Sequence, residues 1–186
     1  MRPYTPVLLL FSCGAALLSS AGAAAVPPPC SAAAHHQFDF WVGEWTVTEH
    51  GKPAGTNRIE RLLDGCALFE NWVGAGGGRG HSLNFYDGGR GLWQQTWVDG
   101  SGGSLNLTGQ FTAGHMVLSG RSTDPKTHKP QIDRITWTPN ANGTVRQLWD
   151  VSLDDGKTWT VSFDGLYSRK LTSGPGAGGR FPITLQ

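Results

Sequence analysis

From residue 45 onward, the chain alternates short runs of β-branched and aromatic residues with clusters of Gly, Asn, Asp and Pro. Such clusters supply residues that tolerate positive φ, and their spacing is typical of β-hairpins. We expect ten antiparallel strands, near residues 45–49, 56–62, 67–73, 81–86, 92–99, 105–111, 115–121, 132–138, 144–153 and 158–169. A helical pattern is expected only for one short turn over 31–37, capped by Ser31.

Ten strands joined by hairpins would leave exposed sheet edges unless the sheet closed on itself. We therefore predict an all-β fold, a single antiparallel up-and-down β-barrel of about ten strands with a short N-terminal helical plug. The octet 38–45, FDFWVGEW, is expected to close one end of this barrel with its aromatic residues. Residues 26–171 are assigned to the barrel domain, and 172–186, which include GPGAGG, to a disordered tail.

The N-terminus has the pattern of a secretory signal peptide over residues 1–25. Arg2 precedes an apolar stretch over 7–18, and small residues over 21–25 offer a cleavage site. The apolar stretch is interrupted and shorter than the about 20 residues that a membrane-spanning helix needs. A lipoprotein signal ending at Cys13 is an alternative, although apolar sequence continues beyond that residue. The expected location is therefore periplasmic or secreted.

Removal of residues 1–25 would leave a chain of one-domain size with 14 basic and 14 acidic side chains, because Arg2 is the one charged residue removed from 15 basic and 14 acidic. This balance provides no basic surface for nucleic acid, and we expect no stable membrane insertion. Cys30 and Cys66 would be the remaining cysteines. An oxidising compartment favours a disulfide between them, with two buried free thiols as the alternative.

Four segments together resemble an exported bacterial family of unknown function: FDFWVGEW at 38–45, LWQQTWVD at 92–99, DRITWTP at 133–139, and VRQLWDVSLDDGKTWTVSFDGLY at 145–167. The resemblance covers almost the whole chain after the signal peptide. It implies a calycin or lipocalin-like barrel, in which a Gly-x-Trp element starts the first strand. Gly43 and Trp45 occupy those positions here. The family implies no activity.

The last of these segments also contains an Asp-box pattern, S-x-D-x-G-x-T-W, at Ser152, Asp154, Gly156, Thr158 and Trp159. This pattern is best known from the hairpins of sialidase propellers, where it repeats at regular spacing. It occurs once here, so we interpret it as a turn rather than as a glycosidase signature. Asp154 is expected to accept backbone hydrogen bonds, and Trp159 to pack beneath the turn.

Side chains in a strand alternate between its two faces, so polar residues that share parity with large apolar neighbours are expected to point into the barrel. This criterion selects Glu70, Trp72, Tyr86, Gln95, Trp97, Arg134, Gln147 and Trp149 as candidate ligand-binding residues. An interior Glu70 or Arg134 must be compensated, either by each other or by amides. Trp137 has the opposite parity to Arg134, and a bulge would turn some of these side chains toward water.

No cofactor is predicted. The six histidines form no H-x-H, H-E-x-x-H or Cys/His cluster, which argues against a metal or haem site. The sequence contains no G-x-S-x-G elbow, Walker loop or dinucleotide-binding fingerprint, and its glycine clusters do not open helices.

The leading functional hypothesis is an exported protein that binds a small, partly apolar molecule inside the barrel, an inference based on fold analogy. A first alternative is a calycin-type enzyme, such as a decarboxylase, isomerase or cyclase, in which Glu70 acts with Arg134 and Tyr86. A second alternative is a barrel filled by its own tryptophans that serves as a structural or interaction protein of the envelope. The sequence favours binding over catalysis and indicates neither the ligand nor the oligomeric state.

Overall fold

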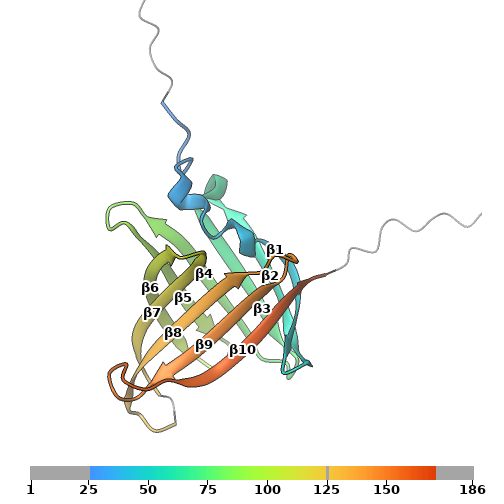
Figure 1. Ribbon diagram of the computed structural model, residues 1–186, viewed down its shortest axis with the longest axis vertical. Helices are drawn as coiled ribbons and strands as arrows, with labels where there is room; N and C mark the ends of the chain where they lie inside the picture. The colour runs from blue at the N-terminus through green and yellow to red at the C-terminus, as the bar shows by residue number, and fades with distance from the viewer. Residues whose placement is uncertain (1–25, 125, 171–186) are drawn as a thin grey trace, which may run out of the picture.

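The structure is a computed structural model that describes residues 26–124 and 126–170 (Figure 1). The predicted signal peptide with Cys13, and the predicted tail at 172–186, lie outside the described residues. No helix in the described ranges is long and apolar enough to cross a membrane.

Ten antiparallel strands form a closed barrel in which each strand pairs with its neighbours in sequence and β1 pairs with β10. This confirms the predicted fold class. The strands are β1 Gly43–Glu49, β2 Lys52–Leu62, β3 Ala67–Gly74, β4 Arg79–Asp87, β5 Leu92–Asp99, β6 Ser104–Thr112, β7 His115–Thr123, β8 Pro130–Pro139, β9 Val145–Ser152 and β10 Thr160–Arg169.

The observed strand limits differ from the predicted ones most at β2 and by at most two residues at the ends of the other strands. β2 begins at Lys52, four residues earlier than predicted, because Pro53 still pairs with Thr48 beyond a bulge in the β1–β2 ladder. A proline is compatible with this position near the start of the strand. β10 begins at Thr160 because Thr158 belongs to the preceding turn.

The N-terminal segment closes one end of the barrel, as the aromatic octet predicted (Figure 1). It contains the 3₁₀ helices η1 Ala33–His36 and η2 Asp39–Trp41, and the N-cap of η1 is Ala32 with no side-chain cap, so the expected Ser31 cap is wrong. Phe38 and Trp41 are completely buried and stack with ring centroids 4.9 Å apart. Phe38 also contacts Trp137 at 5.1 Å, so this half of the interior is filled by side chains.

The chain is held to the last strand where it leaves the plug and enters β1. The indole nitrogen of Trp45 donates a hydrogen bond of 2.8 Å to the backbone oxygen of Trp41. The guanidinium of Arg169 lies 4.1 Å from the centroid of the Trp45 ring and donates to the backbone oxygen of Val42 at 2.7 Å. These contacts join the two ends of the barrel domain at the filled end.

A disulfide between Cys30 and Cys66 fastens the plug to the barrel, which confirms the first of the two explanations for these cysteines. Cys66 follows the 3₁₀ helix η3 Leu63–Gly65 and immediately precedes β3. The bond closes a loop with a sequence separation of 36 residues. The segment before β1 is therefore covalently attached to the hairpin between β2 and β3.

Replacement of both cysteines, Cys30→Ser with Cys66→Ser, should lower the free energy of unfolding by about 3 to 4 kcal/mol, because the loop is no longer closed in the unfolded chain. Denaturant unfolding of the oxidised wild type and of the double variant measures this difference. A reductant should shift the wild-type midpoint and leave that of the double variant unchanged. Identical midpoints for the oxidised wild type and the double variant would contradict the expectation.

Candidate functional site

The half of the barrel away from the plug encloses a cavity of about 310 Å³. Four aromatic side chains surround it, Trp72 on β3, Trp97 on β5, Trp149 on β9 and Phe163 on β10. They lie toward the strand ends that lead into the β3–β4, β5–β6 and β9–β10 loops, and the β9–β10 loop is seen at the end opposite the plug (Figure 1). Further lining residues are Glu70, Gln95, Asp99, Leu105, Ile135, Gln147, Ser162 and Tyr167.

Two of these indole rings each lie against a glycine on the adjoining strand. A Cβ atom on Gly55 of β2 would lie 2.8 Å from the Trp72 ring. A Cβ atom on Gly80 of β4 would collide with the Trp97 ring. Because each glycine faces the interior beside a large aromatic side chain, Trp72 and Trp97 can lie close to the barrel wall and leave the centre open.

A buried carboxylate fixes the orientation of Trp149. Its indole nitrogen donates a hydrogen bond of 3.0 Å to Asp133, which is completely buried. Asp133 also accepts hydrogen bonds from Ser122 and, at 3.1 Å, from Gln131. The Trp149 ring is thus held by its polar edge while its apolar surface lines the cavity.

The floor of the cavity is a hydrogen-bonded network centred on Glu70. Its two carboxylate oxygens accept bonds of 2.6 Å from the Asn57 amide and from the Ser82 hydroxyl. The Asn84 amide donates to Ser82 at 2.8 Å, and the Gln95 amide donates to Asn84 at 2.8 Å. The two donors to Glu70 and the two amides behind them are neutral groups, so no cation compensates its carboxylate within the network.

A second branch of the network connects the floor to the filled half of the barrel. The Tyr167 hydroxyl donates a hydrogen bond of 2.5 Å to the side-chain oxygen of Gln147, which also accepts one of 3.1 Å from the Trp137 indole. The Asn57 amide contacts the Tyr167 hydroxyl at 3.4 Å. Trp137 is thus interior and belongs beneath the floor rather than in the lining of the cavity.

Burial controls the ionisation of this floor. Removal from water raises the pKa of Glu70 from 4.5 to about 7, although the bonds from Ser82 and Asn57 act in the opposite direction. Burial, and then the charge of Glu70, raise the pKa of Tyr167 well above its ordinary value. Glu70 therefore changes protonation state near neutral pH, while Tyr167 stays neutral.

Six of the eight candidate residues line the cavity: Glu70, Trp72, Gln95, Trp97, Gln147 and Trp149. Their predicted orientation toward the interior is confirmed, and their role in binding stays a prediction. Glu70 is compensated by Asn57 and Ser82 rather than by Arg134. Of the two partners considered for Glu70, an amide is the one observed.

Arg134 lies on the outer face of β8, so its predicted orientation is wrong. The inward-facing side chains of this strand include Ile135, which lines the cavity. The guanidinium of Arg134 binds both carboxylate oxygens of Asp150, at 3.0 and 2.8 Å, and lies 3.8 Å from the centroid of the Trp159 ring. Both faces of β8 carry polar and apolar residues, so alternation alone does not indicate which face points inward.

Tyr86 faces the interior but does not line the cavity. Its ring contacts His35 of η1 at 5.2 Å and Trp93 at 6.1 Å, which places it at the plug. The trio of Glu70, Arg134 and Tyr86 that the enzyme hypothesis required is therefore not assembled.

The sequence interpretation missed several residues of the site, among them Asn57, Asp99, Phe163 and Tyr167, and it noted Ser82 and Asn84 only as neighbours of Tyr86. Asn57 alternates with Gly55 and Ile59 along β2. The other face of this strand carries Thr56, Arg58 and Glu60. The large apolar side chain of Ile59 marks the face of Asn57 as the inward one, so the parity criterion used for the other candidates also indicates Asn57.

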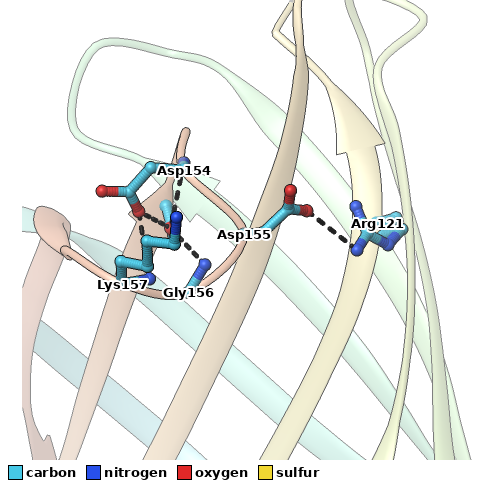
Figure 2. A network of polar contacts seen from close by, with 6 residues as sticks. Arg121, Asp154, Asp155, Gly156 and Lys157 are labelled. Carbon is cyan, nitrogen blue, oxygen red and sulfur yellow. Dashed lines mark hydrogen bonds and ion pairs between the residues drawn. The ribbon is translucent and has the colours of Figure 1, made fainter.

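The Asp-box forms a structural turn between β9 and β10, as predicted. Asp154 accepts hydrogen bonds from the backbone nitrogens of Lys157 at 3.1 Å and Thr158 at 2.8 Å. Asp154 also accepts a hydrogen bond of 2.6 Å from the Thr158 hydroxyl. This bond is the largest of the contributions that lower the pKa of Asp154 to about 2. Figure 2 shows Asp154 turned toward its own loop and Asp155 toward Arg121 on β7, to which it is paired at 3.0 Å. The turn is thus stabilised internally and does not line the cavity.

Residues 26–124 and 126–170 contain no group of three or more His, Cys, Asp or Glu side chains arranged to hold a metal ion. Comparisons with protein-family models and with curated proteins return no match for this sequence. The cavity and its floor are therefore the features on which a functional proposal rests.

Gly80→Ala should destabilise the protein by about 1 to 3 kcal/mol, because the added methyl group overpacks the space occupied by the Trp97 ring. The free energy of unfolding in urea measures this effect. Gly76→Ala is the matched control, because a Cβ atom there meets no atom within 4 Å. Equal stabilities for the two variants would show that Trp97 does not need the close approach.

The stability of the wild type should fall as the pH rises from about 5 to about 8, by about 3 kcal/mol relative to Glu70→Gln. The folded state binds the Glu70 proton more tightly than the unfolded state, since the pKa rises from 4.5 to about 7. This contribution to stability is complete below 4.5 and is lost as the pH passes the folded-state pKa.

Chemical denaturation at several pH values tests this expectation. Glu60→Gln is a suitable control, because Glu60 is partly exposed and bonded to Arg58 outside the barrel. Its pH profile should follow that of the wild type. Parallel profiles for the wild type and Glu70→Gln would contradict the assigned pKa.

Proposed function

We propose that this protein is exported and binds a small, partly apolar molecule in the cavity at the open end of the barrel. The observation that carries the proposal is a hollow of about 310 Å³ between four aromatic side chains and a polar floor. Small-molecule sites are typically cavities of about 300 to 1,000 Å³, mostly apolar and with a few placed polar groups. Glu70, Gln95 and Gln147 are those polar groups here.

The unequal filling of the two halves of the barrel supports binding over a purely structural role. The plug half is packed with Phe38, Trp41 and Trp137, whereas the other half leaves Trp72 and Trp97 beside open space. Side chains that border a void lose the dispersion contacts that close packing would provide. The alternative of a barrel filled throughout by its own tryptophans therefore fits only the plug half.

The proposed location outside the cytoplasm, periplasmic or secreted, rests on the sequence pattern of residues 1–25 and on the disulfide between Cys30 and Cys66, a bond that persists in oxidising compartments. Membership of the exported, lipocalin-like family that the sequence resembles is part of the same proposal. The ten-stranded closed barrel and the Gly43-x-Trp45 element at the start of β1 agree with it.

A second candidate is an acid–base enzyme in which Glu70 acts without Arg134 and Tyr86. The pKa of about 7 beside an accessible cavity favours it, because a general acid or base works best when its pKa is near the operating pH. Binding ranks first because Tyr167, the other titratable group of the floor, has a strongly raised pKa and is a poor partner in proton transfer.

Native mass spectrometry of the protein purified from its own host tests the proposal. We expect a population that carries one small molecule per barrel, released on denaturation. Leu105→Trp should abolish this population, because the larger side chain fills the cavity that Leu105 lines. Recovery of a chemically altered molecule after incubation with the released ligand would favour the enzyme.

Leu83→Trp is the matched control, since Leu83 lies on the outer face of β4 and is partly exposed. It should retain the bound molecule. A wild-type protein found only at its bare mass, or equal occupancy in the wild type and Leu105→Trp, would contradict binding in this cavity.

A further inference from the structure

We propose that the cavity selects an organic cation, a molecule with an aromatic or apolar body and a protonated amine, over neutral or anionic molecules of the same shape. The inference rests on the proposed function and specifies the class of ligand. It follows from the charges that line the cavity, from the unused acceptors of its floor, and from the aromatic side chains around it.

The charges of the cavity lining have a single sign. Among its residues, the acidic side chains are Glu70 at the floor and Asp99 toward the mouth, and none is Lys, Arg or His. Hydrogen bonds led by that from Ser101 lower the pKa of Asp99, which is therefore ionised at neutral pH. The basic side chain of Arg79 lines two neighbouring hollows, one of which shares Trp72, Trp97 and Asp99 with the cavity, but it does not line the cavity itself. An anion that entered the cavity would thus meet two carboxylates and no compensating cation.

The floor presents hydrogen-bond acceptors to the cavity. Each oxygen of Glu70 accepts one bond, from Asn57 or Ser82, while a carboxylate oxygen can accept two. Gln95 uses its amide nitrogen within the network and faces the cavity, which leaves its side-chain oxygen as an acceptor. A protonated amine supplies up to three donors and a positive charge. It would thus satisfy the acceptors and compensate the buried carboxylate together.

The aromatic side chains around the cavity favour the same class of ligand. Trp72, Trp97, Trp149 and Phe163 surround it. The negative face of an aromatic ring attracts a cation by about 0.5 to 2 kcal/mol, and Trp is the strongest of these rings. Trp72 and Phe163 meet edge to face, with ring centroids 6.2 Å apart. The enclosure therefore suits both the apolar body and the charged end of an amine.

A cation and a proton should compete for Glu70, so amine binding should strengthen as the pH rises from about 6 to about 8. The groups that face the Glu70 side chain from the surrounding strands are Asn57 on β2, Ser82 on β4, Gln95 on β5 and Tyr167 on β10. His81 lies on the outer side of the barrel, where its ring contacts the backbone oxygen of Glu70. The charge change of the floor in this range is therefore that of Glu70, whose pKa lies near 7.

Three indole compounds of nearly equal shape test the inference: tryptamine, which is a cation, tryptophol, which is neutral, and indole-3-propionate, which is an anion. Isothermal titration calorimetry with the oxidised protein at about pH 8 should give an affinity for tryptamine at least about tenfold above that for indole-3-propionate, and above that for tryptophol. On lowering the pH of the wild type to about 6, the preference for tryptamine should shrink, and its binding should release protons to the buffer.

Two variants assign the preference to the floor. Glu70→Gln should weaken tryptamine binding by about tenfold and change tryptophol binding by less than about twofold. Glu60→Gln removes the same charge outside the barrel and should bind both compounds as the wild type does. The pH series requires no variant, so the inference stays testable if Glu70→Gln is unstable.

The outcomes separate this inference from the proposed function. Equal or tighter binding of tryptophol or indole-3-propionate overturns the selection of cations and leaves a ligand-binding cavity. Tryptamine binding that is insensitive to pH and to Glu70→Gln also overturns it, because the amine then binds elsewhere. If none of the three compounds binds, the inference fails, and native mass spectrometry decides independently whether the cavity holds another ligand.

Discussion

The pairing of β1 with β10 is the constraint on which the rest of the structure depends. Five residue pairs, from Trp45 with Arg169 to Glu49 with Gly165, join the first and last strands and remove both free edges of the sheet. The same junction carries the stacking of Arg169 on Trp45 and the bond from Trp45 back to the plug. Closure, plug and interior therefore depend on one another, because each uses residues placed by the others.

The two ends of the closed barrel differ, because one is filled by side chains and the other holds the cavity. At one end, stacked aromatic rings and a disulfide exclude water and fix the N-terminal segment. At the other, inward glycines hold Trp72 and Trp97 aside and leave space above a floor of neutral donors. That floor buries one carboxyl group, Glu70, whose oxygens accept hydrogen bonds from neutral groups and from no basic side chain. The raised pKa of Glu70 is the electrostatic result of this burial.

Local sequence patterns predicted the strands, the plug, the turn at Asp154 and six of the cavity-lining residues, because these follow from short-range alternation and turn chemistry. Alternation defines two faces of a strand but does not say which faces inward when both carry polar residues, and Arg134 was therefore misplaced. The network from Asn57 to Glu70 depends on the register between β2 and β3, which pairs Asn57 with Trp72. Hairpin geometry sets that register, so composition alone could not reveal the floor.

The position of the disulfide has a consequence for how the domain could diversify. Cys30 and Cys66 fasten only the plug end, and the loops at 75–78 and 100–103 at the rim carry glycines and no covalent tie. Exposed loop tips of this kind tolerate insertions better than buried segments do. Lengthening or replacing these rim loops would alter what reaches the interior without disturbing the closed base. The disulfide thus fixes the plug end of the fold, whereas the rim loops can vary in sequence and length. This combination makes the fold a suitable scaffold for engineered receptors.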